Sequence, residues 1–168
     1  MSSKISAFLA ASTTCSMVAP AVRTWLAFEA PARAERDHIM LTQIKGLHHV
    51  TSMAADARTN NQFFTDTLGL RRVKKTVNFD SPDVYHLYYG DETGAPGTVM
   101  TYFPFPDMGP GRPGTGEVGT TVFSVPEGSL GFWSDRLSKR GVSGLKAEET
   151  FVEKRLNFAG PDGDVFAL

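Results

Sequence analysis

The stretches FFTDTLG, residues 63–69, and FWSDRL, residues 132–137, repeat one pattern: two aromatic residues, a hydroxyl residue, Asp, any residue and Leu. Phe64 and Leu68 stand four residues apart, as do Trp133 and Leu137. Residues at this spacing share one face of an α-helix, so each stretch predicts a helix packed on a sheet. Two unrelated amphipathic helices would give the same pattern, but the flanking segments repeat as well.

The same kinds of segment surround both predicted helices. Asp56 can cap the first helix and Gly69 can end it, and Ser129 and Gly141 suit these positions in the second. A strand-like run precedes each helix and three follow it, separated by turn residues. These runs are 47–53, then 71–79, 84–90 and 98–105 in the first copy, and 120–125, then 145–151, 153–160 and 164–168 in the second. Each copy therefore predicts the order strand, helix, strand, strand, strand.

The fold class expected from this repeat is α+β, with paired βαβββ modules and a mixed, curved sheet. The first module covers about residues 44–105 and the second about 117–168, joined by a Pro/Gly-rich linker at 106–116. Together they form one domain, residues 40–168. Two such modules can form a cupped surface, which is a common place for a small molecule to bind.

Residues 1–39 differ from the rest of the chain. They are rich in Ala, Ser and Thr and carry no acidic residue before Glu29. The segment loosely matches a secretory signal or a transit peptide, and it can equally be an extension upstream of the natural start. In each case we expect it to be disordered, and a cytoplasmic location is the default.

The composition argues against several classes of partner. The chain has 168 residues, with 17 basic and 18 acidic side chains and a formal net charge of −1, so no basic surface suggests nucleic acid. No run approaches the ~18 apolar residues that a membrane span needs. Cys15 is the only cysteine, which excludes an internal disulfide and a thiolate metal cluster.

Two adjacent histidines open the first strand-like run, in LHHVTSM. Successive side chains of a strand point to opposite faces, so His49 and Thr51 should share a face and His48 should point the other way. Imidazole is a common ligand for transition metals, so one of the two histidines can belong to a metal centre.

The sequence resembles the vicinal oxygen chelate superfamily, which includes glyoxalase I, bleomycin-resistance proteins and extradiol dioxygenases. IKGLHHVTSMAAD (44–56), VKKTVNFD (73–80) and YHLYYGDETGAPGT (85–98) look most like the N-terminal half of hydroquinone-type ring-cleaving dioxygenases. The resemblance implies Fe(II), or Mn(II), held by two His and one carboxylate, with O2 as co-substrate and a dihydroxylated aromatic ring as substrate. It also implies that His49 is a metal ligand, with His48 and Thr51 beside the substrate.

The repeat also gives positions where further ligands could stand. Aligning Asp56 with Glu127 matches His49 to Thr120, and the carboxylate positions after Gly97 and Gly163 hold Thr101 and Ala167. None of these is an ordinary His or carboxylate ligand. His86 is expected to pack in the sheet or to form a hydrogen bond.

The chain is therefore expected to be the N-terminal half of a dioxygenase, inactive alone and either self-associated or completed by a missing C-terminal half. A metal-free aromatic-binding or resistance protein, working as a dimer, is an alternative. A glyoxalase-like lyase is another, although it would need a carboxylate in the expected positions.

Overall fold

A computed structural model describes residues 10–11, 46–112, 114–151 and 153–168. The chain divides into two compact units, Met1–Thr13 with Leu47–Leu168, and Thr14–Gly46. Apart from Gly46, the second unit lies outside the described residues. None of the helices in the described ranges has the length and hydropathy needed to cross a bilayer.

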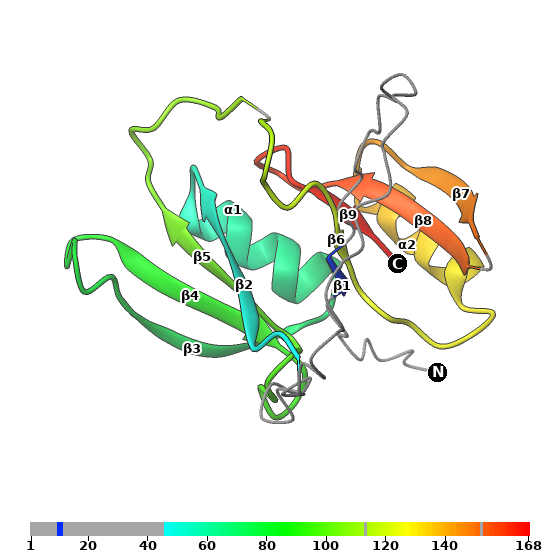
Figure 1. Cartoon of the computed structure of the whole chain (residues 1–168), viewed down its shortest axis with the longest axis horizontal. Helices are drawn as coiled ribbons and strands as arrows, with labels where there is room; N and C mark the ends of the chain where they lie inside the picture. The colour runs from blue at the N-terminus through cyan, green and yellow to red at the C-terminus, as the bar shows by residue number, and fades with distance from the viewer. Residues whose placement is uncertain (1–9, 12–45, 113, 152) are drawn as a thin grey trace, which may run out of the picture. The chain divides into compact units, whose positions relative to one another are not determined.

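The first module contains one sheet and one helical segment. Its elements are β2 (His49–Ala54), α1 (Ala57–Gln62), the π-helical turn η1 (Phe63–Thr67), β3 (Arg71–Val77), β4 (Tyr85–Gly90) and β5 (Val99–Pro104). The strand order is β2-β5-β4-β3, with β2 and β5 parallel and the other pairs antiparallel (Figure 1).

The second module repeats this topology. Its elements are β6 (Thr121–Val122), α2 (Leu130–Lys139), β7 (Lys146–Thr150), β8 (Glu153–Ala159) and β9 (Val165–Ala167). The order is β6-β9-β8-β7, again with one parallel and two antiparallel pairs. The expected α+β class with two βαβββ modules and mixed sheets is confirmed.

β1 (Ala10–Ala11) adds a short strand to the second sheet, antiparallel to β6. Two residues of the segment expected to be disordered are thus in a strand. The other residues of that segment, and Cys15 among them, lie outside the described residues. The division between leader and domain therefore stays a prediction.

The helix ends follow the sequence in three of four cases. The Asp56 side chain accepts a hydrogen bond from Thr59 N–H at 2.7 Å, as expected of an N-cap. Gly69 and Gly141 follow the helices with φ of 76° and 72°, which L-residues rarely adopt. Ser129 does not cap α2 with its side chain, because its hydroxyl donates instead to Pro126 O at 2.6 Å.

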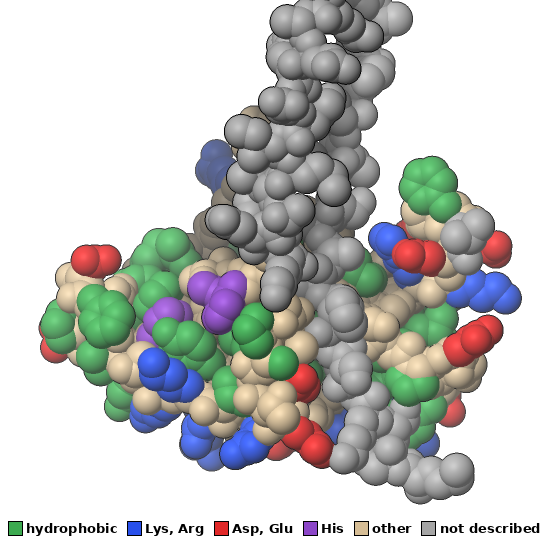
Figure 2. Space-filling model, turned by 60° about the horizontal axis from the view of Figure 1, so that its bottom comes forward, with side chains coloured by type: hydrophobic (Ala, Val, Ile, Leu, Met, Phe, Trp, Pro, Cys, Tyr) green, Lys and Arg blue, Asp and Glu red, His purple; other side chains and the backbone are tan. Residues whose placement is uncertain are grey.

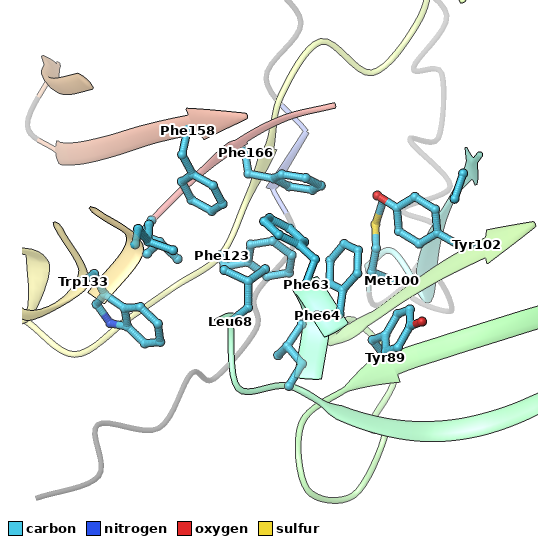
Figure 3. Packing of buried hydrophobic residues seen from close by; sticks show 14 of the residues in the cluster. Phe63, Phe64, Leu68, Tyr89, Met100, Tyr102, Phe123, Trp133, Phe158 and Phe166 are labelled. Carbon is cyan, nitrogen blue, oxygen red and sulfur yellow. The ribbon is translucent and has the colours of Figure 1, made fainter. Parts of the chain in front are cut away.

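Both modules contribute to one aromatic core. Phe64 stacks on Tyr89 with ring centroids 4.8 Å apart and also contacts Phe166 of β9 at 5.9 Å. Its neighbour Phe63 lies 6.0 Å from Phe166, again across the two modules (Figure 3). Trp133 and Leu137 of α2 are buried, as their spacing predicted. The helical segment of module one therefore packs against strands of both sheets.

Polar contacts join the modules around this core. Arg136 of α2 donates to Thr67 O and Asp66 O, both at 2.7 Å. Asp164, just before β9, accepts hydrogen bonds from Tyr102 OH at 2.7 Å and Ser52 Oγ at 3.1 Å. The Asp164 contacts hold β2 and β5 against the turn between β8 and β9.

Candidate metal centre

Strand β2 places His49 and Thr51 on one face of its sheet. His49, Thr51 and Met53 are exposed, whereas the alternating residues are partly or fully buried toward the helical side. The shared face predicted for His49 and Thr51 is confirmed. We call the side of this sheet that carries them the open face.

His48 does not point away from His49. The two Nδ1 atoms are 3.0 Å apart and the rings meet edge to face, with centroids at 5.2 Å. The expected separation is wrong because β2 begins at His49, so strand alternation does not govern His48. Both side chains are exposed.

The strand register extends the open face from β2 across β5 to β4. Thr51 pairs with Thr101, which pairs with Tyr88. The hydroxyl oxygens of Thr51 and Thr101 are 2.8 Å apart, and Thr101 is fully buried. The position where a carboxylate could stand next to His49 thus holds a threonine hydroxyl with a neighbouring hydroxyl as its partner.

His86 lies on the open face among aromatic rings. Its Nδ1 is 2.8 Å from Tyr88 OH, and its ring is 4.0 Å from Phe103, so the predicted hydrogen-bonding and packing role is confirmed. Burial is the main reason why the pKa of His86 is lowered, and the charges of His49 and Lys74 lower it further. Its Nε2 is buried and has no hydrogen-bond partner. The described histidines gather on one face with hydrophobic side chains between them (Figure 2).

The donors on the open face fit part of a metal site. They are imidazole nitrogens and hydroxyl oxygens. In the described ranges no group of three or more His, Cys, Asp or Glu side chains could hold a metal ion. Asp164 accepts a hydrogen bond from Ser52. Ser52 follows Thr51 in β2, so its side chain and Asp164 lie on the opposite face of the strand from Thr51. The described residues therefore fit one histidine ligand but do not supply the two-His, one-carboxylate set.

The contact between His48 and His49 suits a metal-binding role for His49. Metal-bound histidines usually donate the other ring N–H to a fixed acceptor, which sets the tautomer and the ring orientation. If His49 donates from Nδ1 and His48 accepts, the lone pair of His49 Nε2 is left for a metal ion.

Residues 46–168 match the model of the Glyoxalase/Bleomycin resistance protein/Dioxygenase superfamily. The chain belongs to this superfamily. The family inferred from LHHVT and YHLYYGDETGAPGT is confirmed.

Two curated relatives are dioxygenases by name, and the name of the first describes it as ring-cleaving. The chain is 54% identical to MhqE of Bacillus subtilis over 114 residues, which cover 68% of this chain and 37% of the relative. It is 39% identical to the chlorohydroquinone/hydroquinone 1,2-dioxygenase of Sphingobium indicum over 122 residues, 71% of this chain and 38% of that enzyme.

A crystal structure described as that of a dioxygenase from Bacillus subtilis is 43% identical, with a TM-score of 0.70. The match covers 73% of this chain and 39% of that one. The chain thus spans less than two fifths of the length of each of these relatives.

Sequence reasoning missed two features of the site. The imidazole contact between His48 and His49 depends on where β2 begins, which alternation alone does not give. The Asp164 contacts with Ser52 and Tyr102 join residues more than 60 positions apart. The GPDGD turn signalled a hairpin but not its partner in the other module.

Proposed function

We propose that this chain forms one wall of an Fe(II)-dependent, ring-cleaving dioxygenase site for dihydroxylated aromatic compounds. The observation that supports this most is the arrangement of His48, His49 and Thr51 on the open face, in a chain similar to a hydroquinone 1,2-dioxygenase. Mn(II) is compatible with the same ligand type.

In this proposal His49 holds the metal through Nε2, and His48 keeps the His49 ring oriented. The metal, when bound, brings O2 and the aromatic ring together for ring cleavage. Thr51 is an exposed hydroxyl on the same face as His49. When Thr101 donates its O–H to Thr51, the Thr51 O–H is available to a substrate oxygen. The rings of His86, Tyr88 and Phe103 supply an apolar, aromatic surface beside it.

The remaining His and carboxylate would come from outside the described residues. We therefore expect the chain alone to bind Fe(II) weakly and to be inactive, because affinity and geometry depend on the complete ligand set.

A metal-free aromatic-binding protein is the second candidate, supported by the aromatic and exposed apolar side chains of the open face, such as Met53 at 57% exposure. A glyoxalase-like lyase is less well supported, since none of the described strands β2, β3, β4 and β5 contains Asp or Glu.

The test is an anaerobic calorimetric titration of the purified chain with Fe(II), together with measurement of O2 consumption with hydroquinone. We expect weak binding that His49→Ala abolishes and that His48→Ala weakens by about 10- to 100-fold, as for other residues that orient a ligand. His86→Ala is the matched control and should leave Fe(II) binding within about twofold. We expect no O2 consumption.

If the chain alone bound one Fe(II) tightly and consumed O2 with hydroquinone, the proposal of an incomplete site would be contradicted. Fe(II) binding that is unchanged in His49→Ala would contradict the ligand assignment. Hydroquinone binding that is equally tight with and without Fe(II), and unchanged in His49→Ala, would favour the metal-free binding protein.

A further inference from the structure

The sheet of module one carries charged side chains of one sign. Its strands β2, β3, β4 and β5 together contain Lys, Arg and His but no Asp or Glu. In module two, by contrast, β7 and β8 each contain both acidic and basic residues. Lys and Arg side chains lie beside the histidines of the open face (Figure 2). The open face therefore suits a ligand that carries a negative charge.

Lys74 of β3 is the charged side chain that reaches this face. It pairs with Tyr88 across β3 and β4. Tyr88 pairs with Thr101, which pairs with Thr51, so all four side chains share one face. The Lys74 ammonium group lies 5.3 Å from the centroid of the Tyr88 ring, and its charge contributes to the lowered pKa of His86. Lys74 is exposed, and no carboxylate among the described residues forms an ion pair with it.

The neighbouring Lys75 points to the other side of the sheet. Its ammonium group lies 3.7 Å from the centroid of the Tyr85 ring, and Tyr85 alternates with His86 along β4. Lys74 and Lys75 thus carry the same charge and are both exposed, but they belong to opposite faces. A comparison of the two lysines therefore separates binding on the open face from an effect of net charge.

Tyr88 provides a hydroxyl group next to Lys74. Its oxygen lies 2.8 Å from His86 Nδ1. When His86 is the tautomer that donates from Nδ1, the Tyr88 O–H is left to donate to a ligand. An ammonium group and a hydroxyl group are both donors that a carboxylate accepts. The two side chains can therefore bind one carboxylate together.

We propose that Lys74 is a specificity-determining residue that binds a carboxylate group on the aromatic ring of the substrate, with Tyr88 as the second donor. The inference rests on the proposed function, because the hydroxyl groups of the same ring would lie beside His49 and Thr51. It narrows the substrate class to dihydroxylated aromatic carboxylates.

The spacing of the strands and the charge of Lys74 both support this assignment. Neighbouring strands lie about 4.8 Å apart, so β2 and β4 are about 10 Å apart with β5 between them. A ring that lies across β5 with one edge beside His49 has its other edge beside Tyr88 and Lys74. At neutral pH a carboxyl group, with a pKa of about 4, is ionised, whereas a phenol, with a pKa of about 10, is not. The ammonium group therefore selects a carboxylate over a further hydroxyl group.

The test compares 2,5-dihydroxybenzoate with 2,5-dihydroxybenzamide, which has nearly the same shape but no charge. NMR titration of the metal-free full chain at neutral pH and low salt measures both affinities. We expect the acid to bind the parent chain about five- to tenfold more tightly than the amide, between the effect of an exposed ion pair and that of a charged hydrogen bond. Lys74→Gln should bind the two compounds within about twofold of each other, whereas Lys75→Gln should keep the preference for the acid.

Equal affinities of the parent chain for the acid and the amide, or no binding of the acid, would overturn the proposal. An equal loss of preference in Lys74→Gln and Lys75→Gln would also overturn it, because net charge would then be the cause. Both lysines are exposed, so both variants should keep the unfolding midpoint of the parent.

The titration contains no metal, so its result is independent of Fe(II) binding by His49. Fe(II) binding as expected, without a preference for the acid, would contradict only the role of Lys74. A preference for the acid that depends on Lys74, without Fe(II) binding, would contradict only the metal site.

Discussion

At the residue scale, Thr51 and Thr101 lie side by side on β2 and β5, with hydroxyl oxygens 2.8 Å apart. Thr101 is fully buried. Within the described structure, its hydroxyl forms a hydrogen bond with the hydroxyl of Thr51. A buried polar group that loses its partner costs about 1–3 kcal/mol, whereas removing both partners costs much less. The pair is therefore an energetic unit in the sheet as well as part of the candidate site.

We predict that Thr51→Val lowers the free energy of unfolding by about 1 kcal/mol or more, because it leaves the buried Thr101 hydroxyl without a partner. The double variant Thr51→Val/Thr101→Val should cost less than the sum of the two single changes. Urea denaturation of the four chains measures the coupling. Additive single and double effects would show that the two hydroxyls do not interact.

His86 gives a second prediction at this scale. Burial, followed by the charges of His49 and Lys74, lowers its pKa below the usual value of 6.5. We expect His49→Ala to raise the His86 pKa only part of the way to 6.5, since the charge is removed and the burial remains. An NMR titration of the His86 ring protons measures the change. A full return to 6.5 would mean that charge, not burial, is the main cause.

The same shift has a consequence for stability. The folded chain binds the His86 proton less tightly than the unfolded chain, so this contribution is present above pH 6.5 and is lost as the pH falls through the lowered pKa. His86→Phe should therefore lose less stability than the parent chain as the pH falls below 6.5. Thermal unfolding across this pH range provides the measurement, and parallel curves for the two chains would contradict the assignment.

The elements were predictable to a greater extent than the site. The spacing of four residues in FFTDTL and FWSDRL gave two helical segments and their buried residues, but residues 63–67 form a π-helical turn that follows α1, not the expected α-helix. The alternating runs gave the strands of both modules. Alternation also gave the common face of His49 and Thr51. The His48–His49 contact was not predictable, because it depends on the residue at which β2 begins. Long-range contacts such as Tyr102 with Asp164 leave no periodic signal in the sequence.

Arg136 connects the two helical segments, and this contact supports a prediction at the element scale. Its guanidinium donates to the carbonyl groups of Asp66 and Thr67 at the end of η1, where backbone carbonyls lack helical partners. We expect Arg136→Met to lower the free energy of unfolding by about 1.5–3 kcal/mol, the range for hydrogen bonds to charged groups.

Arg136→Lys is the matched control, because it keeps the charge but not the planar guanidinium that donates from Nε and Nη2 together. It should fall between the parent and Arg136→Met in urea denaturation. Equal stabilities of all three chains would show that the Arg136 contacts add nothing measurable.

At the scale of the whole molecule, the two sheets share aromatic residues instead of having separate cores. Phe63 and Phe64, from module one, contact Phe166 of module two at ring-centroid distances of 6.0 and 5.9 Å. Asp164 links the modules on the polar side through Tyr102 and Ser52. A change at this junction removes support from both sheets at once.

We therefore predict that the two modules unfold in one transition and that Phe166→Ala destabilises both together. Truncating a buried phenylalanine costs about 3–5 kcal/mol through lost burial and the cavity that remains. Fluorine NMR of fluorotyrosine at Tyr89 reports on module one, and of fluorotryptophan at Trp133 on module two. In urea the two signals should change at one midpoint, and Phe166→Ala should shift that midpoint equally for both.

Tyr85→Leu on β4 is the control, because Tyr85 is 45% exposed and lies outside the shared core. The urea midpoint of this variant should move much less than that of Phe166→Ala. Separate midpoints for the two signals would mean that each module is stable without the other, and the shared aromatic contacts would then not be what holds the chain together.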